Sequence, residues 1–410
     1  MNNFNELLQK YAKLAVKTGV NIQENQTLVI NAPITAKDFV RAIAKEAYSS
    51  GVIDVHVDWN DEEISLIKFN YANDNVFDHF PDWKATSKES LANEGAAFLS
   101  ISASNPDLLK NVDPKKIART RKAQGKAMEG FKTILNKGNV RWSIVSIPTD
   151  EWAMKVFPNL NKDDAVKKLW ENIFTVTRVD SDDPVKAWDN HINLIKCKTD
   201  LLNKKQFKSL HFKSTGTDLV IDLPKDHIWV GGGLTDHKDI YYIPNMPTEE
   251  IFTTPLKTGV NGVVSSTKPL NYGGNLIENF TLTFKDGRVV DYSAEKGYEI
   301  LKGLIETDEG SHYIGEVALV PDNSPISNTG LIFYNTLFDE NASCHLAIGS
   351  SYPICIKDGT TMNKQQLEEH GLNTSITHVD FMIGSKELSI EGITESGERM
   401  PIFTNGNWSK

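Results

Sequence analysis

TLVINAP (27–33), TAKDFVRAIAKEAYSSG (35–51) and VIDVHVDW (52–59) follow one another near the start of the chain. The first is a short apolar run typical of a buried strand, and the third alternates apolar and polar side chains as a strand does. The middle segment has helical spacing, with Thr35 expected as its N-cap and Gly51 as its end. A strand, a helix and a second strand in this order indicate a parallel or mixed sheet covered by helices.

The same alternation continues through the N-terminal half of the chain. Residues 96–103 (AAFLSISA) and 140–148 (VRWSIVSIP) are further predicted strands, and 183–207 is a predicted long helix that ends this half. We therefore expect residues 1–200 to form an open α/β sheet domain.

The pattern changes after residue 208 to short strands and turns. Asp286-Gly287 and Ser396-Gly397 lie between strand-like segments and are typical of hairpin turns. Helical patterns near 293–307 and 363–370 interrupt the series of strands. Residues 208–410 are thus predicted to form a β-rich α/β domain, so the fold class is α/β with two domains.

Composition narrows the class of protein and its partners. The 410 residues carry a net charge of -10, which disfavours nucleic acid or an anionic membrane as a partner. No apolar stretch approaches the length of a membrane span, and the N-terminus lacks the pattern of a secretory signal. The three cysteines lack CxxC spacing, which favours a reducing cytoplasm over a disulfide framework or a cysteine zinc site.

The segment NTSITHVDFMIG contains the clearest candidate site, His378-Val379-Asp380. In a strand, residues two apart share a face, so an imidazole and a carboxylate would project together. Such a mixed pair suits a divalent cation. Alone, the pair is equally consistent with a hydrogen-bonded His–Asp couple near the surface.

Two further candidates lie in FDENASCHLAIGSSY. Glu340 and His345 are five residues apart, which suits a bend with one ligand on each side. Tyr352, just before a proline, would place a phenol near them; its alternative interpretation is a core aromatic.

The remaining candidates are acids in apolar or extended segments. Glu316, in GSHYIGEVALVP, would share a strand face with apolar residues, where an acid normally needs a cationic partner. His312 is an alternative ligand four residues earlier. In PNMPTEEIFTTP only one of Glu249 and Glu250 is expected to point inward if the segment is extended, and Glu250 is the candidate.

Together these residues make a ligand set of four carboxylates and two imidazoles. Four negative charges in a small volume require cations among them. The set is large enough for two metals about 3.5 Å apart.

PNMPTEEIFTTP, GEVALVP, LFDENASCHLAIGSSY and NTSITHVDFMIGS, in this order, resemble the M29 family of bacterial metallo-aminopeptidases, and most of all its aminopeptidase S type of Gram-positive bacteria. The resemblance covers essentially the whole chain. It implies an α/β N-terminal domain, a catalytic C-terminal domain, a homodimer, and two divalent ions, zinc or cobalt, with manganese also compatible with the ligands. It assigns the metal to Glu250, Glu316, Glu340, His345, His378 and Asp380, and an active-site role to Tyr352.

The expected reaction is hydrolysis of the N-terminal residue from a peptide with a free α-amine, by water activated between two metals. Glu316 is the expected bridging ligand, and Glu316 or Glu340 the expected general base. Another dinuclear metallohydrolase, such as an amidase or deacylase, and a non-catalytic peptide-binding protein remain alternatives. A nucleotide-binding protein is disfavoured because neither GxGxxG nor GxxxxGK[ST] occurs in the sequence.

Overall fold

The computed structural model describes residues 3–103, 105–272 and 275–409. The chain forms two compact units, one made of residues 1–190 and 233–247 and the other of residues 191–232 and 248–410. The segment 233–247 belongs to the first unit because it pairs with that unit's backbone, as in the hydrogen bonds from Ile144 N to Pro244 O and from Ile243 N to Gly19 O. That residues 1–200 and 208–410 fold as independent domains stays a prediction.

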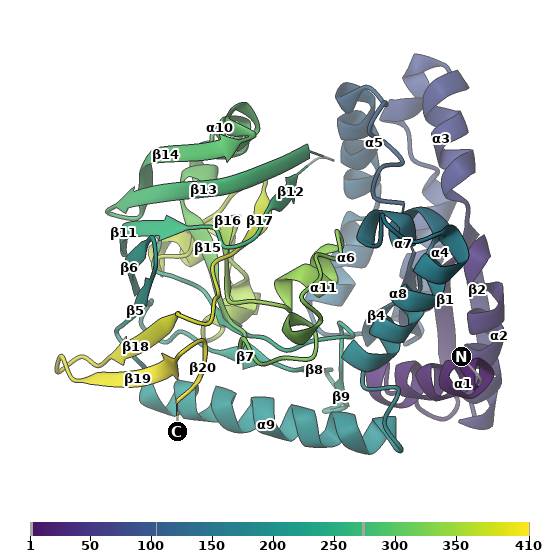
Figure 1. The fold of residues 1–410 in the computed structure, drawn as a ribbon. Coiled ribbons are helices and arrows are strands. Elements are labelled where there is room, and N and C mark those ends of the chain that lie inside the picture. Colours follow the sequence, from purple (N-terminus) through teal and green to yellow (C-terminus); the bar gives the residue numbers. More distant parts are fainter. Residues whose placement is uncertain (1–2, 104, 273–274, 410) are drawn as a thin grey trace. The chain divides into compact units, whose positions relative to one another are not determined.

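The first unit contains the predicted parallel sheet, which confirms the α/β class (Figure 1). Its strands run in the order β2-β1-β3-β4, and every neighbouring pair is parallel. Parallel neighbours need a long crossover, and the helical segments between the strands supply it. The strands are β1 (Thr27–Pro33), β2 (Asp54–Asn60), β3 (Ala97–Ser102) and β4 (Trp142–Ser146).

Helices connect and follow these strands. The N-cap prediction at Thr35 is wrong: Thr35 lies in a 3-10 turn, Ile34–Ala36, and the α-helix begins at Lys37. The chain turns directly after Pro33, so the first helical turn is already formed where the cap was expected. Gly51, at φ +84°, ends the helix as predicted. The helices are α1 (Phe4–Leu14), α2 (Lys37–Ser49), α3 (Glu62–Tyr71), α4 (Asp82–Asn93), α5 (Pro114–Ala127), α6 (Glu129–Asn136), α7 (Asp150–Val156), α8 (Lys162–Val176) and α9 (Pro184–Lys205).

The second unit contains a large antiparallel sheet (Figure 1). The predicted hairpins are present in it. Lys285 pairs with Arg288 across a two-residue turn in which Asp286 and Gly287 both have positive φ, and Gly397 lies in the turn that joins β18 to β19. The strands are β5 (Ser209–Ser214), β6 (Thr217–Asp222), β11 (Val260–Ser265), β12 (Leu270–Tyr272), β13 (Asn275–Lys285), β14 (Arg288–Lys296), β18 (Ser389–Ile393), β19 (Arg399–Thr404) and β20 (Asn407–Trp408).

A smaller antiparallel sheet, which we call the site sheet, has the order β17-β16-β15-β10-β7. One of its faces is apolar: Val317, Leu346 and Phe381 are cross-strand neighbours and fully buried. Phe381 packs against Phe280 of β13 at 5.4 Å between ring centroids, so this face and the large sheet share one core. The strands are β7 (Val230–Gly231), β10 (Ile251–Thr253), β15 (Ile314–Leu319), β16 (His345–Gly349) and β17 (His378–Met382).

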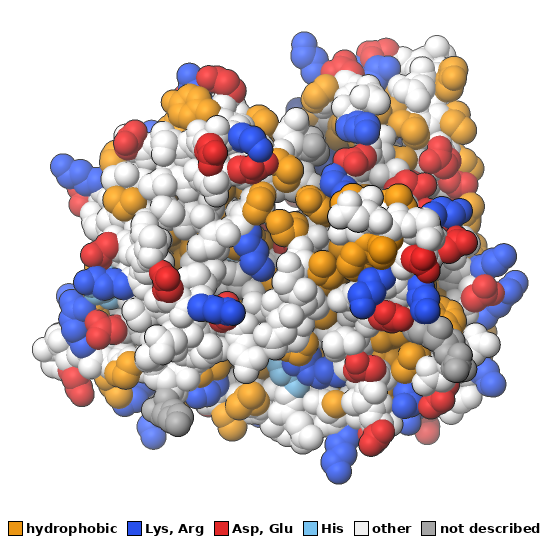
Figure 2. All heavy atoms as spheres, in the orientation of Figure 1, with side chains coloured by type: hydrophobic (Ala, Val, Ile, Leu, Met, Phe, Trp, Pro, Cys, Tyr) orange, Lys and Arg blue, Asp and Glu red, His pale blue; other side chains and the backbone are white. Residues whose placement is uncertain are grey.

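Short helices connect the strands of the second unit: α10 (Tyr298–Ile305), α11 (Thr336–Glu340) and α12 (Lys364–Glu369). The helix expected near 293–307 starts later, because residues up to Lys296 pair with β13 as part of β14. Within the described residues, no helix has both the length and the apolar character needed to span a membrane. On the face shown in Figure 2, acidic and basic side chains are interspersed.

Candidate metal centre

The polar face of the site sheet brings together side chains that are far apart in the sequence. Because alternate residues of a strand share a face, burying Val317, Leu346 and Phe381 on one side turns Glu316, His345 and Asp380 to the other. His378 shares the face of Asp380, as the sequence predicted.

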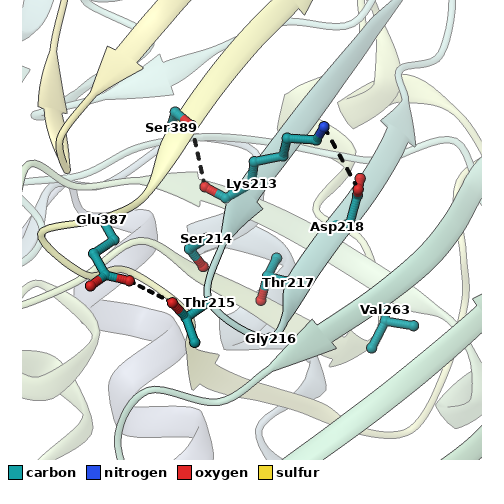
Figure 3. A pocket seen from close by; sticks show the side chains of 9 residues that line it. All are labelled: Lys213, Ser214, Thr215, Gly216, Thr217, Asp218, Val263, Glu387 and Ser389. Atoms are coloured by element: carbon teal, nitrogen blue, oxygen red, sulfur yellow. Dashed lines mark hydrogen bonds and ion pairs between the residues drawn. The ribbon is translucent and has the colours of Figure 1, made fainter.

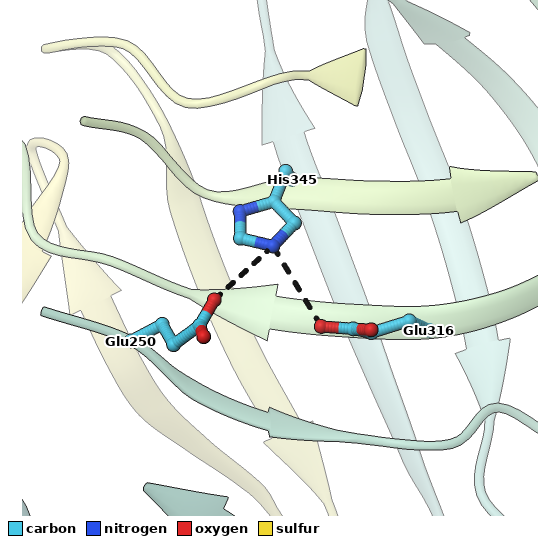
Figure 4. A group of neighbouring side chains, drawn as sticks. All are labelled: Glu250, Glu316 and His345. Atoms are coloured by element: carbon cyan, nitrogen blue, oxygen red, sulfur yellow. Dashed lines mark ion pairs between the residues drawn. The ribbon is translucent and has the colours of Figure 1, made fainter. Parts of the chain in front are cut away.

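Glu250, Glu316 and His345 form a first group of possible ligands (Figure 4). Nε2 of His345 lies 3.4 Å from Oε2 of Glu250 and 3.7 Å from Oε1 of Glu316. The three residues come from the segment before β10, from β15 and from the first position of β16. All three side chains are at most 12% exposed, so their charges are largely withdrawn from water.

Glu316, His378 and Asp380 form a second group. Nε2 of His378 lies 3.2 Å from Oε2 of Glu316 and 3.4 Å from Oδ1 of Asp380. Glu316 therefore belongs to both groups, and each of its carboxylate oxygens faces a different imidazole. Each oxygen of this carboxylate could serve as a ligand to a separate cation.

Both imidazoles are held from behind by the main chain. Nδ1 of His345 is 3.0 Å from the carbonyl oxygen of Ser343, and Nδ1 of His378 is 2.7 Å from that of Ser350. A carbonyl accepts only from N–H, so in each ring Nδ1 carries a proton and Nε2 is the nitrogen that faces the acids. Metal-binding histidines are commonly oriented in this way.

Small residues lie between the ligands on the sheet. Ala347 stands directly between Glu316 and Asp380 in the cross-strand register, and Gly349 is opposite His378. A β-sheet places such neighbours only about 5 Å apart, so a large side chain at residue 347 would occupy the space above the sheet. The alanine leaves that space to the ligand atoms.

The charges of the groups perturb one another strongly. Burial raises the pKa of Glu250, although His345 partly opposes this. Burial would lower the pKa of His378, but Asp380 and Glu316 outweigh it and raise the value to about 10. Burial would also lower the pKa of His345, but the carboxylates of Glu250 and Glu316 outweigh it and raise this pKa well above the usual range. The acids therefore favour any positive charge among them.

This donor set fits divalent metal ions. Carboxylate oxygens and imidazole Nε2 atoms are ordinary ligands for zinc, cobalt and manganese. Oδ1 of Asp380 is buried and receives no hydrogen bond from the described residues, although Nε2 of His378 is near it. A buried carboxylate oxygen of this kind is costly unless a cation contacts it.

Glu340 is the last residue of α11, and His345 starts β16, so the bend predicted between them is present. Glu340 lies outside the two groups but interacts with them electrostatically. Burial, followed by the negative charges of Glu250 and Asp380, raises the pKa of Glu340 well above the usual range. Its place in the chain suits a further ligand.

Tyr352 lies at the exposed side of the groups. Its ring centroid is 4.6 Å from that of His378, and the side chain is 44% exposed. Burial of the hydroxyl and the nearby Glu316 carboxylate raise the pKa of Tyr352, so the phenol keeps its proton at neutral pH and can donate a hydrogen bond.

Two neighbouring residues, His312 and Glu249, lie apart from the two groups. His312, the alternative ligand, ends a separate 3-10 turn and belongs to neither group; burial and then the charge of Arg288 lower its pKa. Of Glu249 and Glu250 only Glu250 faces the site, as expected for an extended segment, although Glu249 is buried too. Glu249 faces His191, 3.5 Å away, while Glu250 faces His345.

A shallow hollow at the β5–β6 turn is a poorer candidate for a functional site (Figure 3). Its polar groups bind one another: Thr215 Oγ1 donates to Glu387 at 2.6 Å, and Lys213 Nζ lies 3.8 Å from Asp218. None of the six predicted ligands lines it.

Comparison with known proteins shows the family of the chain. The family described as "Thermophilic metalloprotease (M29)" matches residues 4–408. The chain is 53% identical over 409 residues to Aminopeptidase AmpS of Bacillus subtilis (strain 168), covering 100% of both, and 52% identical to Aminopeptidase 2 of Geobacillus stearothermophilus, covering 100% of this chain and 99% of that one. The solved structure of wild-type AmpT from Thermus thermophilus superposes with a TM-score of 0.94 at 39% identity, covering 99% of this chain and 100% of that one. The resemblance seen in the sequence is thereby confirmed, and the chain belongs to the M29 family of metalloproteases.

Proposed function

We propose that this member of the M29 family, a metallo-aminopeptidase, holds two divalent cations and uses them to hydrolyse the first peptide bond of a substrate with a free N-terminus. The proposed ligands are Glu250, Glu316, Glu340, His345, His378 and Asp380. The observation that carries the proposal is the position of Glu316, whose two oxygens face two different imidazoles, each beside a second carboxylate.

Bound ions of this kind polarise a carbonyl oxygen and lower the pKa of water. The protein's own residues would transfer the proton and stabilise the developing charge. Glu316 or Glu340 accepts the proton of the attacking water and passes it to the leaving amine. The phenol of Tyr352 donates a hydrogen bond to the carbonyl oxygen as negative charge develops there.

The proposed site also gives a reason why a free N-terminus would be selected. A free α-amine can bind a metal ion or a site carboxylate, whereas the amide nitrogen of an acetylated N-terminus has neither a basic lone pair nor a charge to offer. An exopeptidase needs this discrimination, and an amidase or deacylase does not.

The test is activity on a panel of aminoacyl-anilides, after chelation and after zinc, cobalt or manganese is added back singly. We expect activity to vanish with chelation and to return with the metal, and N-acetylated substrates to be refused. Undiminished activity in the chelated enzyme would refute the metal proposal. Equal rates on free and acetylated substrates would point to an amidase instead.

The proposal extends to the setting of the enzyme. We infer a cytoplasmic location, since Cys197, Cys344 and Cys355 are all free thiols, which suits a reducing compartment. We also infer a homodimer, on the resemblance to the family; sedimentation of the purified protein tests it.

A further inference from the structure

The side chain of Asn341 joins the two segments that carry Glu250 and Glu340. It is completely buried. Its Oδ1 accepts a hydrogen bond of 2.8 Å from the backbone N–H of Glu249, directly before Glu250. Its Nδ2 donates to the carbonyl oxygen of Leu337 at 3.0 Å and lies 3.4 Å from Oε1 of Glu340.

These contacts matter because Glu340 has little other support. It ends a helix of only five residues, and among the described residues Asn341 is the hydrogen-bond donor to its carboxylate. Glu250 lies outside the regular strand, one residue before β10 begins at Ile251. Neither acid is therefore fixed by a sheet ladder, in contrast to Glu316 and Asp380, which lie within strands.

The chemistry of an amide suits this position. A lysine or arginine beside Glu340 would neutralise the carboxylate and compete with a metal for it. A neutral N–H orients the carboxylate and leaves its charge available, as partners behind metal ligands commonly do. The amide also offers a donor and an acceptor at once, so one side chain can hold both segments.

We propose that Asn341 is a positioning residue that sets the separation of Glu250 and Glu340, and so controls the metal affinity of the site. This rests on the proposed metal centre. Asn341 would act through the two carboxylates and would not touch the substrate.

The experiment titrates zinc into the chelated full-length protein, wild type and variants, by calorimetry, and follows thermal unfolding in parallel. In Asn341→Ala all three contacts of the side chain are lost. In Asn341→Asp the shape and the acceptor for Glu249 N–H are kept, but the amide N–H that faces Glu340 is replaced by a second acid. The matched control is Asn203→Ala: Asn203 also bridges two main-chain groups, accepting from Trp229 N–H at 2.8 Å and donating to Trp229 O at 2.9 Å, but contacts none of the proposed ligands.

We expect the zinc affinity to fall about 10–100-fold in both Asn341 variants and to stay at the wild-type value in Asn203→Ala. Wild-type affinity in Asn341→Asp would overturn the inference, and so would a loss in Asn341→Ala no greater than in Asn203→Ala. If the alanine variant does not fold, the aspartate variant decides alone. Absence of zinc binding in the wild type would refute the metal centre itself, a different outcome from wild-type binding that the variants retain.

Discussion

Replacing Glu340 by glutamine is expected to raise the stability of the metal-free protein and to reduce the stability that the protein gains on binding metal. In the metal-free protein, burial and the nearby acids raise the pKa of Glu340. The folded state then binds a proton more tightly than the unfolded chain, so the free energy of unfolding falls as the pH rises above the ordinary glutamate range. Glutamine carries no such penalty. At pH 7.5, the metal-free variant should therefore unfold at a higher temperature than the metal-free wild type.

Metal binding should stabilise the wild type more than it stabilises the variant. At a metal concentration about 100 times the Kd, binding stabilises the wild type by about 2.7 kcal/mol. If loss of a ligand weakens binding about 100-fold, the same concentration stabilises the variant by only about 0.4 kcal/mol. For a unit of 150–250 residues each kcal/mol shifts Tm by about 2–4 °C, so the gain should fall from about 5–11 °C to about 1–2 °C.

Differential scanning calorimetry of chelated and zinc-loaded protein measures both effects. Glu369→Gln is the matched control, because Glu369 also ends a short helix but is exposed. The control should leave both transitions unchanged. If Glu340→Gln lowers the Tm of the metal-free protein, or keeps the full gain with zinc, Glu340 is not a buried metal ligand.

Three other changes give distinct results. Ala347→Leu keeps every proposed ligand but fills the space between Glu316 and Asp380, so the zinc content measured by mass spectrometry should fall. The protein should be destabilised by about 1–3 kcal/mol and stay folded. Full zinc content would contradict the proposal that Ala347 leaves space for the metal ligands. Partial burial of Asp308 would raise the pKa of its carboxyl group, but hydrogen bonds from Ile376, Ser375 and Ser311 outweigh this effect and lower the pKa to about 2. Asp308→Asn should therefore cost about 1–2 kcal/mol in urea unfolding at pH 7, and the difference from wild type should shrink as the pH falls from about 4 toward 2, where the wild-type carboxylate is protonated; a difference independent of pH would disprove the assignment. Asp236→Ala should destabilise the first unit by about 3–5 kcal/mol in the same assay, because it leaves the buried charge of Arg141 unpaired, and a loss below 1 kcal/mol would show that solvent reaches the pair.

Local patterns accounted for much of the fold. The strand–helix–strand order of residues 27–59 was sufficient to predict a parallel sheet, and turn residues such as Asp286-Gly287 were sufficient for the hairpins. These features depend on side chains a few positions apart. The same is true of His378 and Asp380, whose common face follows from the two-residue period of a strand.

Other features depend on partners distant in the sequence. Glu249 is buried because His191 lies against it, 58 positions earlier, and nothing in PNMPTEEIFTTP indicates that partner. Residues near 293 look helical, but pairing with β13 keeps them in a strand. Asn341 was missed because a buried amide gives no signal in a sequence; only its place directly after Glu340 could have drawn notice.

The alternation of side chains across the site sheet constrains how genes for such enzymes can vary. Outside α11 and Asn341, the segments between β15, β16 and β17 can gain or lose codons without changing which way the acids and imidazoles of the strands point. Deleting a single codon inside one of these strands, such as that of Val379, would turn every later residue of the strand to the opposite face, sending Asp380 into the apolar core and Phe381 toward the proposed metal ligands. Insertions and deletions should therefore be tolerated at the strand ends and eliminated by selection within them.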